Sequence, residues 1–276
     1  MQKQLVISIP SDSTSQINFD PLISFLEETE VDYKIIKSFR EKKIQSGLYH
    51  KEFDIVIMPL HKIPVKLLDG ICIAAVTGRE SQEQYLVINP EKIDISNLRA
   101  INSDAIFGHD SLMIQSQFSA LFPHAQHKVL RIGEVKKITS LEDSNYSGVV
   151  LDGSSKLLNR LKDNHPLKKL AVNEIVPPPG AGVVGYICRM DDIQTRSVLK
   201  NIHVSAVSEK TNIERKVMSR FENTDLVACY VHKDNRGNFH GYAAFEKPDK
   251  KLYKTTVSQS TTYRLADEII NKLNNL

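Results

Sequence analysis

The sequence has little cysteine, and the few cysteines are not grouped. Among 276 residues there are three, and they are far apart, odd in number and surrounded by apolar residues: Cys72, Cys188 and Cys229. This pattern excludes both a disulfide framework and the spacing of a metal site. Because Cys229 lies in a Val-Ala-Cys-Tyr-Val segment, we expect it to be a small buried hydrophobe.

Long apolar runs and strong net charge are absent as well. No apolar segment approaches the ~20 residues that a membrane-spanning helix needs, so we expect no membrane association. The N-terminus leads directly into a predicted strand instead of a signal peptide, which predicts a cytoplasmic protein. The formal net charge of +3 is too small to indicate a nucleic-acid partner, although it allows a local basic site for a small anion. We expect a monomer.

The remaining composition is that of a globular protein with room for two or three domains, at 41% hydrophobic and 25% charged residues. Short apolar strands alternate with amphipathic helices, which predicts parallel or mixed α/β sheets. In the first lobe we expect strands at 5–9, 33–36 and 54–58, with helices at 21–28 and around 44–48. In the second we expect strands near 105–107, 128–130 and 148–151, with helices at 111–122 and 155–161.

The predicted fold class is therefore α/β with three domains: two periplasmic-binding-protein-like α/β lobes around a cleft, and a small C-terminal α+β domain. Residues 1–97 together with about 180–205 form discontinuous lobe 1, because the strand at 183–189 is expected to return to it. Residues 98–179 form lobe 2, and residues 206–276 the C-terminal domain. In that domain we expect helices at 211–221 and 261–273 and strands at 226–232, 241–246 and 252–257.

A proline- and glycine-rich segment at Val176–Arg189 is the most informative part of the chain. Three prolines that cannot donate to a sheet precede three spaced glycines and an apolar strand: Pro177, Pro178, Pro179, Gly180, Gly182 and Gly185. The segment alone is compatible with an ordinary loop before a strand. Together with other segments it indicates a crossing between domains.

Three further segments accompany it in a characteristic order. They are the strand and proline-terminated turn at 54–64, the strands at 70–88, and the helix followed by a strand at 214–232. In order and spacing the four segments resemble those of hydroxymethylbilane synthase, also called porphobilinogen deaminase, over nearly the whole chain. The resemblance implies a three-domain fold and a place in tetrapyrrole (haem) biosynthesis as a transferase.

The same resemblance points to two altered chemical positions. Members of this family hold a dipyrromethane cofactor through a cysteine thioether in a turn after the helix, and here Asp225 stands at that position. A carboxylate cannot form a stable thioether, so no such cofactor is expected. The family's catalytic aspartate, aligned on Pro64, is replaced by Lys62, next to His61. A cation there would oppose the positively charged intermediate instead of stabilising it.

The family also lines its cleft with arginines that bind the substrate's carboxylates in bidentate pairs. Most of these are replaced here, at Pro10, Met113, Ile114 and Thr139. Arg131 aligns with a retained arginine, and Lys137 keeps the charge of a second one without its planar fork. Lys42 lies at the expected position of a cofactor-contacting lysine. The candidate ligand-binding residues are Lys42, His61, Lys62, Ser111, Arg131 and Lys137.

Several of these residues also have a simpler explanation. His61, Lys62 and Arg131 could be solvated surface residues, and Ser111 could serve as a helix N-cap. Asp225 could be a turn carboxylate without function.

These observations predict a pseudoenzyme of the family that binds an anionic pyrrole ligand or a tetrapyrrole-pathway protein. One alternative is an active synthase that converts four porphobilinogen molecules to hydroxymethylbilane with ammonia release. It would use displaced residues, either Cys229 as cofactor anchor or Asp225 and Glu222 as carboxylates. A second alternative is a regulatory or scaffolding partner of an authentic synthase.

Overall fold

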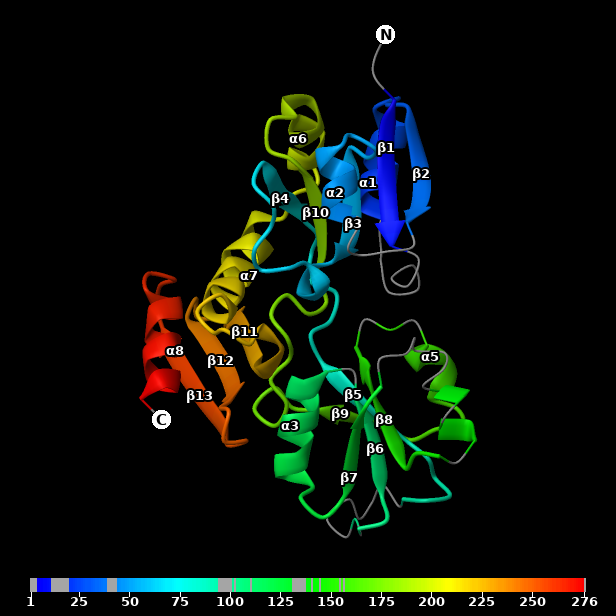
Figure 1. The fold of residues 1–276 in the computed structure, drawn as a ribbon, viewed down its shortest axis with the longest axis vertical. Coiled ribbons are helices and arrows are strands. Elements are labelled where there is room, and N and C mark those ends of the chain that lie inside the picture. Colours follow the sequence, from blue (N-terminus) through cyan, green and yellow to red (C-terminus); the bar gives the residue numbers. More distant parts are fainter. Residues whose placement is uncertain are drawn as a thin grey trace. The chain divides into compact units, whose positions relative to one another are not determined.

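The computed structural model describes residues 4–10, 20–38, 44–93, 101, 103–109, 111–130, 138–139, 141–143, 145–153, 155 and 157–275 (Figure 1). The chain forms two compact units. The first consists of Met1–Glu80 with Gly180–Lys210, and the second of Ser81–Pro179 with Thr211–Leu276. Each unit is therefore made of two separate stretches of sequence.

The first unit is built on a five-stranded mixed sheet with the order β2-β1-β3-β10-β4 (Figure 1). Its strands are β1 (Leu5–Pro10), β2 (Tyr33–Ser38), β3 (Ile55–Pro59), β4 (Ile71–Val76) and β10 (Val184–Arg189). β1 runs parallel to β2 and β3, whereas β10 runs antiparallel to β3 and β4. All residues of β3 and β10 are buried, in keeping with their mainly apolar sequences, and Arg189 at the end of β10 is the charged exception.

Two apolar clusters in this unit reflect the alternation of side chains along its strands. The unit's shorter helices are α1 (Asp20–Glu28), α2 (Ile44–Tyr49) and α6 (Ile193–Lys200). Ile55 and Ile57 of β3 belong to a cluster that contains residues of α1 and α6. Val56 and Met58 belong to a second cluster with Leu48 of α2. Because successive side chains of a strand point to opposite faces, the sheet has a core on each side.

The second unit contains another five-stranded mixed sheet, with the order β7-β6-β8-β5-β9. Its strands are β5 (Gln84–Ile88), β6 (Ile106–His109), β7 (Gln126–Val129), β8 (Gly148–Asp152) and β9 (Leu167–Leu170). Helix α3 (Leu112–Leu121) packs Ile114 and Phe118 into one of its cores, and α5 (Leu158–Leu161) packs Leu161 into the other. Like the first unit's sheet, this sheet therefore has an apolar core on each side.

A three-stranded antiparallel sheet completes the second unit. Strands β11 (Val227–Lys233), β12 (Phe239–Glu246) and β13 (Leu252–Gln259) follow one another in space as in sequence. Helix α8 (Leu265–Asn274) lies against β12 and β13. A Cβ atom at Gly241 would lie 2.6 Å from Cδ1 of Ile269, so the helix approaches the strand more closely than a side chain would permit. Helix α7 (Ser205–Met218) extends from the first unit into the second.

The predicted α/β fold class is confirmed, since two mixed α/β lobes accompany a small C-terminal α+β domain. β10 returns to the first sheet, as expected. One predicted boundary is wrong, because the strand at 84–88 pairs with β8 and β9, so the first lobe ends near Glu80 and not at residue 97. The other domain limits remain predictions.

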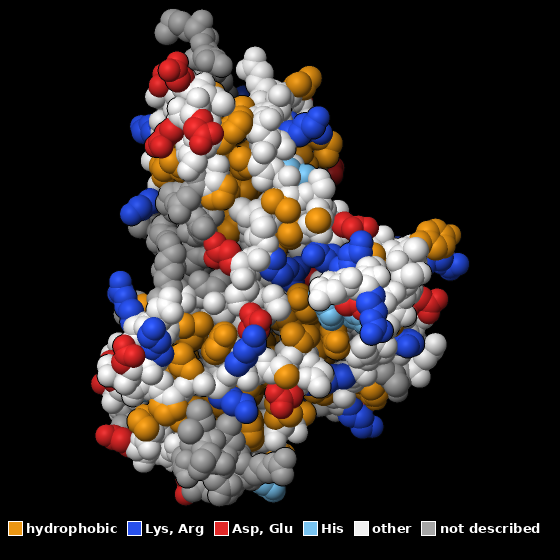
Figure 2. All heavy atoms as spheres, turned by 180° about the vertical axis from the view of Figure 1, so that it is seen from behind, with side chains coloured by type: hydrophobic (Ala, Val, Ile, Leu, Met, Phe, Trp, Pro, Cys, Tyr) orange, Lys and Arg blue, Asp and Glu red, His pale blue; other side chains and the backbone are white. Residues whose placement is uncertain are grey.

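Several element boundaries also differ from expectation. α7 begins at Ser205 and not at residue 211, and β12 begins at Phe239 and not at residue 241. β9 and α6 were not predicted. Among the described residues, no helix is both long and apolar enough to span a membrane. Side chains of both charges are spread over the face in Figure 2, in keeping with a net charge of only +3.

Candidate functional site

The turn after β3 presents two of the candidate residues at the edge of the first sheet. A 3-10 turn, Leu60–Lys62, follows the strand directly. The Leu60 backbone N–H donates to the carbonyl oxygen of Val183 at 2.8 Å, and Leu60 and Ile63 are both buried. His61 and Lys62 between them are half-buried. The apolar anchors on either side therefore hold this short cationic turn at the carboxyl end of β3, a usual ligand-binding edge of open α/β sheets.

The turn after β4 contributes a further cation to the same edge. Thr77 exchanges hydrogen bonds with Val184, its N–H donating to the carbonyl oxygen and its hydroxyl accepting from the N–H, both at 3.0 Å. Arg79 follows and is half-buried. Because β10 pairs with β3 on one side and β4 on the other, both turns flank its first residue. Sequence analysis did not select Arg79, although its position just after a strand of the same sheet could have indicated it.

The glycines of the proline–glycine segment shape this edge. Gly180 has a φ of +81°, a conformation that side-chain-bearing residues rarely adopt. A Cβ atom there would also lie 2.8 Å from Cγ of Leu60. The carbonyl oxygen of Gly182 accepts from the Glu80 backbone N–H at 2.9 Å. The segment is thus packed against both cationic turns. Within it, between Pro179 and Gly180, the chain passes from the second unit to the first.

In the second unit, Ser111 is a helix cap. Its hydroxyl oxygen accepts from the Ile114 N–H at 3.2 Å, as expected for the N-cap of α3. Met113 and Ile114, which the sequence resemblance matched to family arginines, are each 3% exposed. Met113 packs with Ala228 and Tyr230 of β11, and Ile114 packs in the lobe core. These two positions are interior to the unit and cannot present a charge to a ligand in this arrangement.

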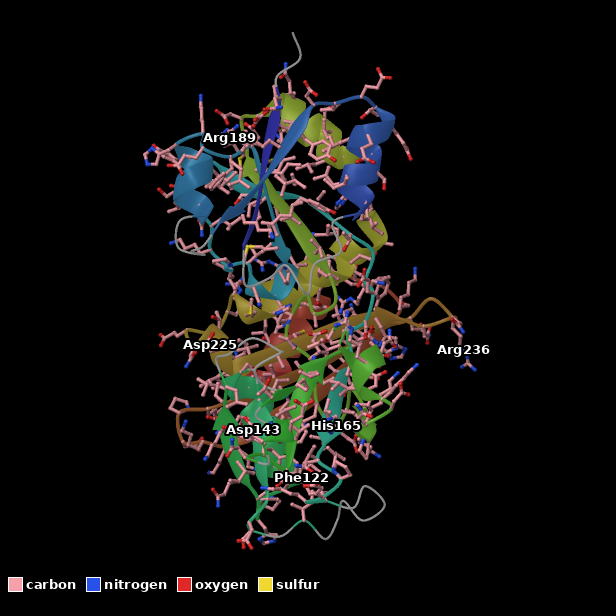
Figure 3. The ribbon with its side chains drawn as sticks, turned by 90° about the vertical axis from the view of Figure 1, so that its right-hand side faces the viewer. Phe122, Asp143, His165, Arg189, Asp225 and Arg236 are labelled. Atoms are coloured by element: carbon pink, nitrogen blue, oxygen red, sulfur yellow. The ribbon has the colours of Figure 1, made fainter. Side chains whose placement is uncertain are left out.

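Asp225 lies in a short 3-10 turn, Thr224–Leu226, immediately before β11 (Figure 3). Its side chain is exposed, and its backbone N–H donates to the side chain of Asn223 at 3.2 Å. Cys229 is fully buried in β11 and lies opposite Ala243. Cys229 lies on the same face of the sheet as Gly241, and this face packs against α8. The exposed turn position therefore carries a carboxylate, and the nearby thiol is internal.

An Asp–His–Ser trio lies on the three-stranded sheet. The Nδ1 atom of His240 is 2.8 Å from Oγ of Ser258, and its Nε2 atom is 3.0 Å from Oδ2 of Asp234. The Oδ1 atom of Asp234 accepts from the N–H groups of Arg236 and Asn238 in the turn between β11 and β12. The trio resembles a hydrolytic arrangement in composition, but Asp234 is engaged in closing the hairpin. We interpret it as a structural network.

Three predicted candidates, Lys42, Arg131 and Lys137, lie outside the described residues. Within the described part of the chain, no group of three or more His, Cys, Asp or Glu side chains is placed to hold a metal ion. The structure brings His61 and Lys62 together on one turn and places Ser111 and Asp225 in the other unit. Whether any of these residues binds a ligand remains a prediction.

Comparison with protein families agrees with the order of these segments. Residues 28–197 match the family model described as porphobilinogen deaminase, dipyromethane cofactor binding domain. The chain belongs to the porphobilinogen deaminase family, since the match spans more than half of it.

Individual relatives are distant. The chain is 27% identical over 203 residues to porphobilinogen deaminase of Nostoc sp., covering 73% of this chain and 62% of that protein. It is 25% identical over 237 residues to the enzyme of Staphylococcus saprophyticus, covering 84% and 75%. The match to the enzyme of Nitrosomonas europaea is 29% identical over 180 residues and covers 65% of this chain and 56% of that protein. The first and third of these matches thus span less than two thirds of the relatives' length.

Among solved structures, similar chains include an arginine-bound amino acid transporter substrate-binding protein of Streptococcus pneumoniae, at 13% identity and a TM-score of 0.47, covering 77% of this chain and 92% of that one. The glutamate-bound GluR0 ligand-binding core has 14% identity and a TM-score of 0.46, covering 74% and 94%.

Proposed function

We propose that this family member binds an anionic pyrrole compound without carrying a thioether-linked dipyrromethane cofactor and without polymerising porphobilinogen. The observation that carries the proposal is the position of Asp225 in the turn before β11. By the resemblance of the turn motifs it stands where the family has its attachment cysteine, and it occupies an exposed turn. A carboxylate at an accessible attachment position cannot form the sulfur–carbon bond on which the family's chemistry depends.

The cations at the edge of the first sheet support the binding part of the proposal. Lys62 aligns with the family's catalytic aspartate and is held with His61 on the turn after β3. A positive charge there disfavours a cationic intermediate, whereas it favours a carboxylate ligand. Arg79, on the turn after β4, adds positive charge to the same edge, with its Nε and Nη1 atoms buried. The edge thus suits the acetate and propionate groups of pyrrole compounds.

The competing hypothesis is an active synthase that uses displaced residues. Its thiol candidate, Cys229, is 0% exposed and packed between the sheet and a helix. A cofactor could be attached there only if the packing on that face of the sheet opened. Asp225 and Glu222, its carboxylate candidates, are exposed. This burial weighs against the thiol route and leaves the carboxylate route to experiment.

One set of measurements on the purified chain separates these functions. We expect the intact mass to equal that of the polypeptide without a dipyrromethane, and we expect no conversion of porphobilinogen to hydroxymethylbilane. We also expect porphobilinogen to raise the melting temperature, because a ligand at 100 times its Kd stabilises the folded state by about 2.7 kcal/mol. A covalent increment or steady turnover would refute the proposal.

Variants locate the site. Lys62→Ala and Arg79→Ala should each reduce the ligand-induced thermal shift. Lys66→Ala is the matched control, because Lys66 is an exposed cation on the loop that follows the first turn, and it should leave the shift unchanged. If no carboxylated pyrrole shifts the melting temperature while a tetrapyrrole-pathway protein co-purifies with the chain, the regulatory or scaffolding hypothesis replaces ligand binding.

A further inference from the structure

Two of the three cysteines lie opposite each other on neighbouring strands. Cys188 of β10 is the antiparallel register partner of Cys72 of β4, and β4 is an edge strand of the first sheet. Opposite residues in antiparallel strands have Cα atoms about 4.5–5.5 Å apart, and disulfides need about 4.4–6.8 Å. Both cysteines belong to the same apolar side of the sheet, Cys188 within the cluster of the first unit and Cys72 packed against it. The strand pairing therefore gives the two cysteines a Cα separation in the range that a disulfide needs.

The two thiols differ in accessibility. Cys188 is fully buried in the apolar cluster of the first unit, whereas Cys72 is half-buried at the margin of that cluster. Because Cys188 is buried and Cys72 is partly exposed on an edge strand, a reagent from solvent is expected to meet Cys72 first.

The charges around the pair favour the same order of reaction. The neighbouring Cys188 thiol and, to a smaller extent, the Arg196 guanidinium lower the pKa of Cys72 to about 7, against the opposing effect of burial. The pKa of Cys188 is raised by the neighbouring Cys72, by burial and by the charge of Asp192, with Arg196 opposing. An electropositive, partly exposed thiol with a pKa near ambient pH is well suited to attack a disulfide.

We propose that Cys72 and Cys188 are a redox pair, in which Cys72 is the attacking thiol and Cys188 the resolving thiol for low-molecular-weight disulfides of the glutathione type. The Cys72 thiolate attacks one sulfur of the small disulfide, forms a mixed disulfide and releases one small thiol. Cys188 then loses its proton and attacks the Cys72 sulfur, which releases the second small thiol. The protein dithiol is oxidised by two electrons, and the small disulfide is reduced to two thiols.

The consequence is a reversible modification site in the first unit. The new bond would tie the edge strand β4 to β10, whose first residue lies between the two cationic turns. The proposal does not depend on the function proposed above, because it needs only the strand pairing and the asymmetry of the thiols. A pair of ordinary core cysteines would instead resist a mild disulfide reagent.

The test begins with the full chain, reduced, freed of reductant and incubated with oxidised glutathione near neutral pH. Peptide mapping without reductant should find the Cys72 peptide joined to the Cys188 peptide, and the intact mass should fall by two hydrogens. Cys229 should remain a thiol, since it is buried in the second unit. No reaction, a stable glutathione adduct on Cys72, or a bond to Cys229 would overturn the proposal.

Variants assign the roles. Cys188→Ser should stop at the glutathione adduct on Cys72, Cys72→Ser should give neither product, and Cys229→Ser should react like the unchanged protein. Arg196→Gln should slow the first step several-fold near neutral pH, whereas Arg236→Gln, exposed at a hairpin turn in the other unit, should not. Equal rates for the two arginine variants would contradict the role of Arg196. If a cysteine variant fails to fold, the peptide mapping of the unchanged chain still tests the proposal.

Discussion

Arg189 illustrates how one buried side chain joins several parts of the first unit (Figure 3). Its guanidinium donates to the carbonyl oxygens of Leu48 and Phe53 at 3.1 and 2.6 Å. It also pairs with Asp54 and Asp192, both at 2.7 Å. The other oxygen of Asp54 accepts from the backbone of β1. A single residue at the end of β10 thus links α2, β1, β3 and the start of α6.

Replacing Arg189 should strongly destabilise the protein. Arg189→Met removes the charge partner of Asp54, whose side chain is only 3% exposed. Removing one member of a buried pair costs about 3–5 kcal/mol because the other charge remains buried. Urea unfolding measures the loss. Arg236→Ala, at an exposed turn, is the control and should change the free energy of unfolding by less than ~0.5 kcal/mol. Similar midpoints for both variants would contradict this account.

Asp192 predicts a specific dependence of stability on pH. Burial pushes the pKa of its carboxyl upward, but hydrogen bonds from Thr195 and Arg189 outweigh it, so the folded pKa lies below the ordinary value. The stabilisation from Asp192 is then complete above the unfolded pKa of about 3.9 and is lost as pH falls through the lower folded value. Unfolding measured from neutral to acidic pH should show the advantage over Asp192→Asn shrinking with acidification.

The control for this pH effect is the neighbouring residue. Asp191 is exposed, so Asp191→Asn should follow the unchanged protein across the same pH range. If Asp192→Asn keeps a constant difference in free energy down to acidic pH, the hydrogen bonds do not favour the ionised carboxyl.

Sequence reasoning at the residue scale succeeded where a signal was local. Ser111 could be predicted as a cap because the cap pattern lies within a few residues of it. The opposition of Cys72 and Cys188 could not, because it depends on the register between strands more than 100 residues apart in the chain. Counting cysteines excluded a disulfide framework, yet it could not show which thiols would become neighbours.

At the scale of elements, Gln117 joins α3 to the segment before the prolines. Its side-chain amide donates to the carbonyl oxygen of Val176 at 2.9 Å and accepts from the Val176 N–H at 2.8 Å. Both groups are buried. The side chain therefore substitutes for a strand partner and satisfies an irregular backbone segment inside the unit.

Gln117→Ala should leave these two backbone groups without partners. The free energy of unfolding should fall by roughly 1–3 kcal/mol for each buried group left unsatisfied. Gln194→Ala, on the exposed side of α6, is the matched control and should be nearly neutral. Thermal or urea unfolding measures both. An unchanged free energy of unfolding for Gln117→Ala would mean that water or a rearranged segment replaces the side-chain amide.

The elements that sequence reasoning missed have weak local signals. β9 has the sequence Leu-Lys-Lys-Leu, and both of its lysines are exposed. It nevertheless forms a strand by pairing with β5. Nζ of Lys169 also lies 2.7 Å from Oε1 of Glu83. Lysine on an edge strand prevents unwanted pairing with other chains, so it makes such a strand look polar. Among the described residues of α6 only Thr195 and Leu199 are buried, which is too narrow a stripe to predict a helix.

At the scale of the whole molecule, the chain crosses between its two units three times: at Glu80–Ser81, Pro179–Gly180 and Lys210–Thr211. The proline–glycine segment indicated the second crossing, whereas nothing in the sequence indicated the first. The strand at 84–88 is a short apolar run that would suit either sheet, so its assignment depended on pairing that only the structure supplies. Of the candidate site residues, the resemblance located His61 and Lys62 but not Arg79.

We expect the backbone amides of the two compact units to lose their protection from hydrogen exchange independently. Leu22→Ala empties a fully buried position of α1 and should lower the stability of the first unit by about 2–5 kcal/mol. Hydrogen exchange measured by mass spectrometry should accelerate for amides of β1 and β2, with little change for β6 and β8. Leu121→Ala, at a position 38% exposed, is the control. Equal acceleration in both units would mean that they unfold as one.

The packing of Met113 and Ile114 limits which substitutions the second unit can accept. A guanidinium at either position would have to leave water and enter a filled apolar interior, which would destabilise the unit. A cation could be accommodated there only if several facing residues changed together. Variation of charge in this unit is therefore expected at its exposed positions and not along the buried side of α3.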